Sequence, residues 1–150
     1  MLYYLSLGSN LGEREQTLRE AVRRMEQQIG TISRCSSFYY SAPWGFDSTN
    51  EFCNLCCALE TALSPLEVLR RTQAVELQLG RTRKSVNGRY ADRTIDIDII
   101  QAYDDEGKEI IINYQLSINN LILPHPLWQQ REFVCVPLNE IKEAKTSNKV

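Results

Sequence analysis

Apolar residues recur along this chain with two different periods, and the order of those periods constrains the fold more than any other feature. Short apolar or alternating runs, which are typical of strands, cover residues 2–7, 31–40, 52–62 and 95–103. Runs with helical spacing cover residues 13–28 and about 64–79. The chain is therefore predicted to run strand, helix, strand, strand, helix, strand.

Both predicted helices carry end signals. The first is amphipathic, with apolar residues at helical spacing: Leu18, Ala21, Val22, Met25 and Ile29. Gly30 follows as its stop. Ser64 is placed as the N-cap of the second helix, with Pro65 at the first position and Glu67 closing a capping box. Gly80 is the stop of that helix.

The last third of the chain adds a hairpin and a tail. Residues 104–107 predict a turn into a short run at 109–112, and residues 133–136 predict a last short strand. The order β-α-β-β-α-β with an added hairpin is typical of a ferredoxin-like α/β (α+β) sandwich with a mainly antiparallel sheet. We expect one domain over residues 1–150, with a frayed, charged tail at 142–150.

Charge and composition exclude several kinds of partner. The formal net charge is −2, so no overall field favours nucleic acid or an anionic membrane surface. No stretch approaches the roughly 20 apolar residues of a membrane helix. The five cysteines are an odd number without the spacing of a small disulfide scaffold, which favours free thiols in a reducing compartment. We expect a cytoplasmic monomer whose partners are small molecules.

Asp96 and Asp98 lie two residues apart in a strictly alternating run. On a strand they project from the same face, and the isoleucines at 95, 97 and 99 take the other face. Two carboxylates on one face repel each other unless a cation lies between them, and hard oxygen ligands of this kind suit Mg²⁺. The alternative is a solvated strand face, which is the commoner case for an isolated Asp-x-Asp.

The segment just upstream is strongly basic. Residues 81–93 contain Asp92 and five cations, which are Arg81, Arg83, Lys84, Arg89 and Arg93. Guanidinium groups match phosphate oxygens in two-point geometry. A basic segment that leads into a carboxylate pair has the charge layout of a Mg–nucleotide site. Taken alone, the segment would be a solvated loop.

Other positions have a functional and a structural interpretation. Glu76 falls near the inner edge of the second helix, where it pairs with a loop arginine, touches a nucleotide or is an ordinary boundary residue. Phe52 and Asn54 share a strand face, so they form either a stacking plate beside an amide or a core residue and a turn partner. His125 is the only histidine, and a lone histidine is more often structural than catalytic.

Seven stretches of the chain resemble sequence motifs of one known family, and they occur in the same order. They are residues 7–12, 36–39, 43–45, 52–54, 76–83, 93–99 and 124–126. The most specific are Gly80-Arg81-Thr82-Arg83 and Arg93-Thr94-Ile95-Asp96-Ile97-Asp98-Ile99. From about residue 3 to residue 140 the chain resembles the 6-hydroxymethyl-7,8-dihydropterin pyrophosphokinase family of folate biosynthesis. The resemblance implies a ferredoxin-like fold and transfer of pyrophosphate from ATP, the co-substrate, to the pterin hydroxymethyl group, which leaves AMP.

The resemblance also implies roles for individual residues. The catalytic candidates are Arg83, Arg93, Asp96 and Asp98, of which Asp96 and Asp98 resemble the ligands of two Mg²⁺ ions. The candidates for ATP binding are Glu76, Arg81, Arg83, Arg93, His125 and Arg131. The candidates for pterin binding are Ser41, Ala42, Pro43, Trp44, Phe52, Asn54 and Phe133, with the two phenylalanines as plates on either side of the ring.

Five positions depart from the family pattern. Ser41 and Ala42 stand where Thr and Pro are usual, and Trp44 stands where a smaller aliphatic residue is common. Phe52 replaces an expected Tyr, and Tyr90 replaces a frequent Trp. These changes leave the chemistry intact and bear on the fine geometry of the pocket.

Three rival interpretations remain open. A ligand-sensing module on the same fold would keep Phe52 and Asn54 but need neither Asp96 nor Asp98. An RNA-recognition module shares the strand order, but it requires exposed aromatic residues and a basic surface, which the net charge of −2 disfavours. A different phosphoryl or nucleotidyl transferase is the nearest rival in chemistry, and it would release ADP or pyrophosphate in place of AMP.

Overall fold

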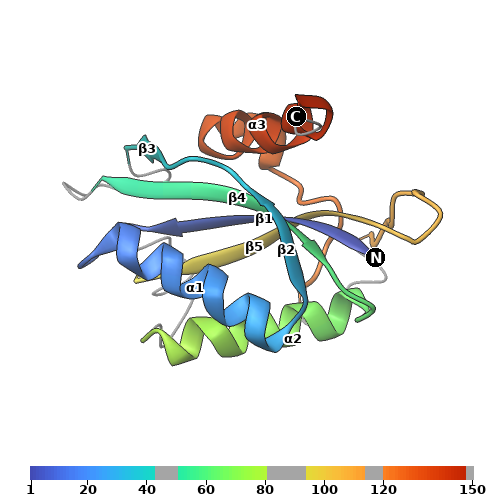
Figure 1. Cartoon of the computed structure of the whole chain (residues 1–150), viewed down its shortest axis with the longest axis horizontal. Coiled ribbons are helices and arrows are strands. Elements are labelled where there is room, and N and C mark those ends of the chain that lie inside the picture. The colour runs from blue at the N-terminus through green and yellow to red at the C-terminus, as the bar shows by residue number, and fades with distance from the viewer. Residues whose placement is uncertain (43–50, 81–93, 114–119, 148–150) are drawn as a thin grey trace.

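The computed structural model describes residues 1–42, 51–80, 94–113 and 120–147, with side chains to residue 143. Its centre is an antiparallel sheet (Figure 1). The strands are β1 (Leu2–Ser9), β2 (Thr31–Cys35), β3 (Tyr39–Ser41), β4 (Phe52–Glu60) and β5 (Asp96–Tyr103). Their order is β2-β4-β1-β5, and β3 also pairs with β4. This arrangement confirms the ferredoxin-like α/β sandwich that the sequence predicts.

Helices α1 (Arg14–Gln28) and α2 (Pro65–Gln78) cover one face of the sheet (Figure 1). The buried residues of α1 are Leu18, Ala21 and Met25, which the helical spacing predicted. They join the main core, which also contains the inward-facing side chains of β1, β4 and β5. At α2, Ser64 Oγ accepts a hydrogen bond from Glu67 N at 3.4 Å, and Gly80 has a φ of +97°. The predicted cap and stop are thereby confirmed.

The opposite face of the sheet is covered by α3 (Glu132–Ser147), which follows the short 3₁₀ helix η2 (Trp128–Gln130). The prediction of a strand at residues 133–136 is wrong. A four-residue apolar run fits a strand or a helix, and only residues further along the chain reveal the helical period. A second core cluster forms here from Val134, Leu138 and Ile141 of the helix with Tyr4, Cys56, Ala58 and Ile100 of the sheet.

The helix also includes residues that we expected in a charged tail. It continues through Ser147, so Lys142 lies within it. Lys142 Nζ donates a hydrogen bond to Gln101 Oε1 at 2.6 Å and lies 4.9 Å from the centroid of the Tyr4 ring. Burial lowers the pKa of this amine. Lys142 thus holds the second half of α3 against the sheet, because its amine lies over the Tyr4 ring and also has a polar partner on β5.

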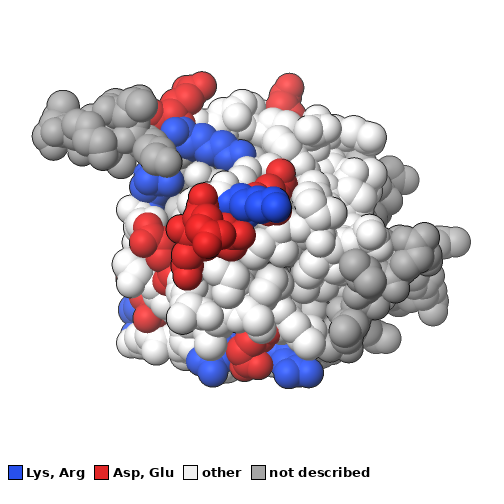
Figure 2. Space-filling model, turned by 90° about the vertical axis from the view of Figure 1, so that its right-hand side faces the viewer, with Lys and Arg blue, Asp and Glu red and all other residues white. Residues whose placement is uncertain are grey.

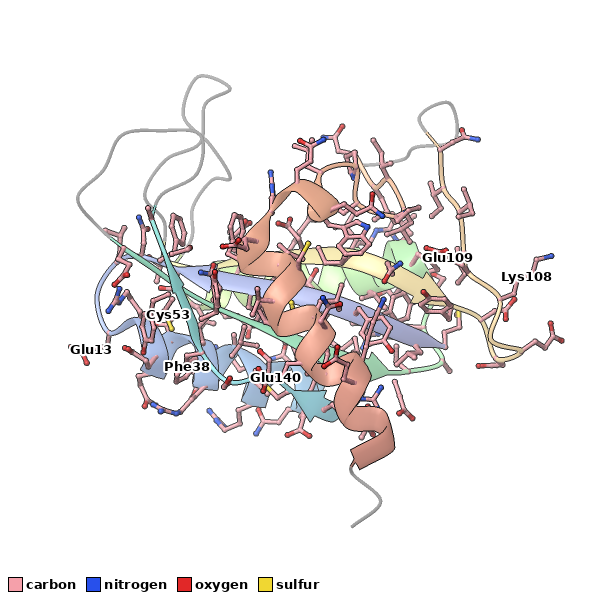
Figure 3. The ribbon with its side chains drawn as sticks, turned by 90° about the horizontal axis from the view of Figure 1, so that it is seen from above. Glu13, Phe38, Cys53, Lys108, Glu109 and Glu140 are labelled. Carbon is pink, nitrogen blue, oxygen red and sulfur yellow. The ribbon has the colours of Figure 1, made fainter. Side chains whose placement is uncertain are left out.

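The single strand expected at residues 31–40 is divided into β2 and β3. Between them, Ser36 Oγ accepts a hydrogen bond from Cys56 N at 2.9 Å, so a side chain takes the place of a ladder bond. The next residue turns to α3, where Ser37 N and Ser37 Oγ donate to Glu140 at 3.0 and 2.8 Å. Figure 3 looks down on α3 and shows Glu140 on the side of the helix toward Phe38. A contact with a helix about 100 residues later therefore bends this segment.

The end of the sheet where β5 finishes is acidic. Gly107, with a φ of +82°, ends the turn that follows β5, and the amino terminus of Met1 pairs with Asp105 at 3.0 Å. The predicted return at residues 109–112 forms only isolated bridges, one of them between Ile112 and Leu123. Figure 2 shows acidic side chains gathered on this side of the molecule, which disfavours this side as a phosphate site.

None of the helices in the described ranges has the length and apolarity of a membrane span.

Candidate active site

The other end of the sheet brings the predicted pterin and metal residues onto neighbouring strands. Gly8 of β1 pairs with Asn54 of β4 on one side and with Asp96 of β5 on the other. Ser6, two residues earlier, pairs with Asp98. These residues share the face that α3 packs on, but the apolar contacts of α3 lie further along the strands. The apolar side of α3 thus leaves the polar end of this face uncovered, as far as the described residues show.

The carboxylates of β5 lie as the alternation predicts. Ile97 and Ile99 are 3% and 5% exposed, and Asp96 and Asp98 are half-buried. A pocket of about 220 Å³ lies along this strand. The residues that line it include Asp96, Asp98, Asn120, Leu121, His125 and Arg131. Four of the predicted site residues, two acidic and two nitrogen-bearing, are therefore brought together in one cavity.

His125 is held by its own segment of backbone. Its N–H donates to Ile100 O at 2.9 Å, which fastens the residue to β5. Its Nδ1 accepts a hydrogen bond from Leu127 N at 3.1 Å. A ring nitrogen that accepts carries no proton, so the neutral imidazole has its proton on Nε2. In the pocket, Nε2 is a hydrogen-bond donor suited to an anionic oxygen.

Arg131 connects the pocket to the start of α3. The residue is 6% exposed, and its carbonyl oxygen accepts hydrogen bonds from Val134 N and Cys135 N, both at 2.9 Å. The guanidinium carbon lies 5.8 Å from the centroid of the Phe133 ring. A buried cation against an aromatic face is held in a defined position. Arg131 and Phe133, predicted for different ligands, therefore lie against each other.

Asn54 has both amide hydrogens occupied by the protein. Its Nδ2 donates to Tyr39 O and to Ser41 Oγ, both at 2.9 Å. These two bonds fix the orientation of the amide, so that Oδ1 is the atom that can accept a hydrogen bond from a ligand. Phe52 is half-buried on the same face, two residues earlier. Asn54, Ser41 and Phe52 therefore form one group, and Ala42 is exposed at its edge.

Gly8 allows these groups to lie close together. A Cβ atom added at Gly8 would lie 3.0 Å from Asn54 Oδ1 and 3.5 Å from a ring carbon of Phe52. Asn54 Oδ1 would have to shift by a few tenths of an ångström to accept a Cβ atom here, whereas the distance to the Phe52 ring is an ordinary van der Waals contact. The absence of a side chain thus shapes the surface between the strand of Asn54 and the strand of Asp96.

Glu76 lies on α2 and is buried, with 7% of the residue exposed. Its Oε2 accepts a hydrogen bond from the backbone N of Ile97 at 2.7 Å. The predicted position of Glu76 near the inner edge of the second helix is correct, and the contact that the structure shows there is with the backbone of β5. The contact places Glu76 next to the residue that separates Asp96 from Asp98.

The donors present fit a metal ion that arrives with its substrate. Within the described residues, no group of three or more His, Cys, Asp or Glu side chains could hold a metal ion. Mg²⁺ typically takes one or two carboxylates and completes its coordination with phosphate oxygens and water. The half-buried Asp96 and Asp98 match that requirement. Arg131 and His125, which line the same pocket, are suited to the phosphate oxygens that would complete the coordination.

The three buried cysteines are protonated core residues. All five are free thiols, as the sequence predicted, and Cys53, Cys56 and Cys57 are buried. Burial raises the pKa of Cys53 to about 11 and that of Cys56 to about 12. The buried thiols are protonated at neutral pH and are neither nucleophiles nor metal ligands.

Several predicted site residues lie outside the described part of the chain. They are Pro43, Trp44, Arg81, Arg83 and Arg93.

Three further residues belong to the site and were not predicted as site residues from the sequence. They are Tyr39, Gly8 and Asn120. Tyr39 acts through its backbone oxygen, which leaves no mark in the sequence. Asn120 lines the pocket with a φ of 63°, and asparagine is a residue type that tolerates this conformation.

Comparisons with known proteins agree on one family. The family described as 7,8-dihydro-6-hydroxymethylpterin-pyrophosphokinase (HPPK) matches residues 4–143. A 2-amino-4-hydroxy-6-hydroxymethyldihydropteridine pyrophosphokinase of Porphyromonas gingivalis is 41% identical over 152 residues, which cover 98% of each chain. The Bacillus subtilis protein of the same name is 37% identical, over 92% of this chain and 76% of its own length.

A solved structure is similar in fold. It is the crystal structure of an HPPK-DHPS in complex with substrates, with a TM-score of 0.66 and 14% identity. The similarity covers 93% of this chain and 40% of that one. At this identity the likeness supports the fold alone.

Proposed function

The chain belongs to the 7,8-dihydro-6-hydroxymethylpterin-pyrophosphokinase family, and from this premise we propose how its residues divide the work of the reaction. As a member it transfers pyrophosphate from ATP to the hydroxymethyl group of 6-hydroxymethyl-7,8-dihydropterin in folate biosynthesis. The hydroxyl oxygen forms a bond to the β-phosphorus of ATP, the bond from that phosphorus to the α-phosphate bridge breaks, and AMP leaves.

The pairing of Gly8 with both Asn54 and Asp96 carries the proposal. It supports a pterin bound over β4 whose hydroxymethyl group points toward β5, where the carboxylates lie. Bringing two reactants together in a fixed orientation is the main requirement of such a transfer. The short distance between neighbouring strands provides that arrangement without any movement of the sheet.

Asp96 and Asp98 would hold Mg²⁺, with two ions as the expected number. Mg²⁺ supplies charge neutralisation of the phosphate oxygens when bound. With the metal bound, the two carboxylates would hold the triphosphate end of ATP at the pocket, and either of them could accept the hydroxyl proton as the new bond forms. Their half-buried position supports this role, because a metal site needs a partly dry cavity and access for the nucleotide.

The nitrogen donors of the pocket would bind the phosphates from the other side. His125 offers its Nε2–H and Arg131 its guanidinium, and both line the cavity with the aspartates. Arg81, Arg83 and Arg93 would add charge from the basic segment, with Arg83 and Arg93 as the catalytic candidates among them. Charge that develops on the phosphates would thus meet fixed donors.

The pterin would lie between Phe52 and Phe133, with Asn54 Oδ1 accepting from its edge. The hydrogen bonds from Asn54 to Tyr39 and Ser41 support this orientation of the amide. Ser41, Ala42, Pro43 and Trp44 would complete the edge of the pocket. The pterin and ATP are both small molecules, and we propose that the enzyme binds them as a monomer. We also propose a reducing, cytoplasmic compartment, where its five free thiols are stable.

Removal of the metal tests the proposed Mg²⁺ dependence. Protein treated with a chelator and then supplied with ATP and the pterin alcohol should form no AMP, and added Mg²⁺ should restore the reaction. Two separable phases in a Mg²⁺ titration, one at the ATP concentration and one above it, would support two ions. Full turnover in the presence of excess chelator would contradict the role given to Asp96 and Asp98.

A further inference from the structure

Glu76 places a carboxylate in the interior of the protein. It is 7% exposed, on the inward face of α2. A buried carboxylate is unfavourable unless hydrogen bonds satisfy it. One bond of this kind is short: Oε2 accepts from Ile97 N at 2.7 Å. This length is at the short end of the range for N–H···O hydrogen bonds, so the contact holds the strand backbone firmly.

The strand that receives this contact lies at the edge of the sheet. In the described residues, β5 pairs with β1 and has no further strand beyond it. Ile97 is opposite Leu7 of β1, and its N–H is directed to Glu76. A backbone N–H at a sheet edge needs a partner from water, a side chain or another strand. Glu76 takes the place of that missing strand at one residue.

The residue held in this way lies between the two carboxylates of the site. The Ile97 nitrogen belongs to the rigid peptide that joins it to Asp96, so fixing this nitrogen restricts the backbone torsions on both sides. Those torsions set the directions in which the side chains of residues 96 and 98 leave the strand. A small rotation of this peptide would move the two carboxylates relative to each other.

We propose that Glu76 is a positioning residue, which holds Asp96 and Asp98 in the geometry that Mg²⁺ requires by accepting the Ile97 N–H. This inference rests on the proposed function, because it takes the two aspartates as metal ligands. It gives Glu76 a role through β5, in addition to any contact with ATP. Groups that orient metal ligands typically affect metal affinity by about 10–100-fold.

Three variants separate this role from a general structural one. Glu76→Ala removes the acceptor, Glu76→Gln keeps a neutral acceptor, and Glu67→Gln is a control on the exposed side of the same helix, where the carboxylate pairs with arginines. The first readout is the affinity for Mn²⁺ in the presence of a non-hydrolysable ATP analogue, measured by electron paramagnetic resonance. The second is the proton chemical shift of the Ile97 amide. The third is the KM for the pterin.

We expect a graded result. Glu76→Ala weakens Mn²⁺ binding by about tenfold or more, and Glu76→Gln weakens it by only about threefold, because the amide oxygen of glutamine can still accept the Ile97 N–H. The Ile97 amide proton moves upfield in both variants, further in the alanine variant. The KM for the pterin stays within about twofold of wild type, because Phe52 and Asn54 lie on β4 and not on the strand that Glu76 holds. Glu67→Gln matches wild type in all three readouts.

Several results would overturn the inference. Equal Mn²⁺ affinity in wild type and Glu76→Ala would do so, as would an Ile97 amide shift that does not change. Equal losses of Mn²⁺ affinity in the Gln and Ala variants would assign the effect to charge and not to the hydrogen bond. If the alanine variant does not fold, the Gln variant decides, because an unchanged Ile97 amide and Mn²⁺ affinity there would exclude the role. A wild-type protein that neither binds Mn²⁺ with the analogue nor forms AMP would instead remove the proposed function itself, and this inference with it.

Discussion

Gly8 and Asn54 approach each other so closely that a Cβ atom on Gly8 would lie 3.0 Å from Asn54 Oδ1. The two residues are directly paired between β1 and β4. The oxygen concerned is the atom that we assign to pterin recognition. The backbone of β1 therefore forms part of the surface on which the pterin would lie.

Substitution of Gly8 should affect the pterin more than ATP. In Gly8→Ala the added methyl group shifts Asn54 Oδ1 by a few tenths of an ångström, so the KM for the pterin should rise by about tenfold, which corresponds to about 1.4 kcal/mol. The KM for ATP should change much less. Steady-state kinetics with each substrate varied in turn measures both values. An equal rise in both constants would contradict a local effect on pterin binding.

Removal of one carboxylate should abolish turnover without unfolding the protein. Asp98 is half-buried at the pocket, so Asp98→Ala leaves no core cavity but removes a proposed metal ligand. The rate should fall by more than about 100-fold. The control is Asp105→Ala, on the turn at the opposite end of the sheet. A circular dichroism spectrum that shows an unfolded Asp98→Ala protein would contradict this prediction.

The tautomer of His125 can be tested by two amide substitutions. Leu127 N donates to His125 Nδ1, so the proton of the neutral ring is on Nε2, which we assign as the donor to the phosphates. Glutamine can place its amide nitrogen near the position of Nε2, whereas asparagine can replace only Nδ1. We therefore expect His125→Gln to keep most of kcat and His125→Asn to lose about tenfold or more, the range of one charge-assisted hydrogen bond. The reverse order in single-turnover rates would show that Nδ1 is the functional atom.

The stability of the fold should depend on the ionisation of Tyr3 at alkaline pH. Tyr3 is fully buried, its hydroxyl donates to Leu63 O at 2.6 Å, and burial raises its pKa from 10.0 to about 12. The folded pKa is above the unfolded one, so the neutral hydroxyl stabilises the fold below pH 10. That stabilisation is lost as the pH rises through 10 toward 12.

Comparison with Tyr3→Phe isolates this effect, because the other tyrosines are common to both proteins. At pH 8 the variant should be less stable by about 1 kcal/mol, the value of one hydrogen bond. At pH 11 the wild type should lose about 1.4 kcal/mol relative to the variant, which corresponds to about one pH unit above the unfolded pKa. Urea unfolding at the two pH values measures the change. A stability difference that is independent of pH would contradict the assignment.

The sequence predicts the features that depend on local periodicity. The alternation at residues 95–99 correctly separated the buried isoleucines from the two aspartates, because side chains on a strand alternate strictly. The cap at Ser64 and the stop at Gly80 were also correct, since both signals act within a single turn.

Features that depend on distant contacts were not predictable in this way. The break after Cys35 forms because Ser36 bonds to Cys56 and Ser37 bonds to Glu140, and neither partner is near in the sequence. Residues 133–136 predict a strand and form a helix, because their apolar run is too short to show a period. The backbone acceptor on Tyr39 and the partner of Glu76 emerge only from the register of the strands and the packing of α2.

The most direct test of the account is the identity of the products formed from ATP, Mg²⁺ and 6-hydroxymethyl-7,8-dihydropterin. Nucleotide products can be resolved by ion-exchange chromatography, and the pterin product by mass spectrometry. The account predicts AMP and a pyrophosphorylated pterin in equal amounts. ADP with a monophosphorylated pterin, or free pyrophosphate with an adenylated pterin, would show a different transfer. A folded, Mg²⁺-loaded protein that forms no AMP would contradict the central claim.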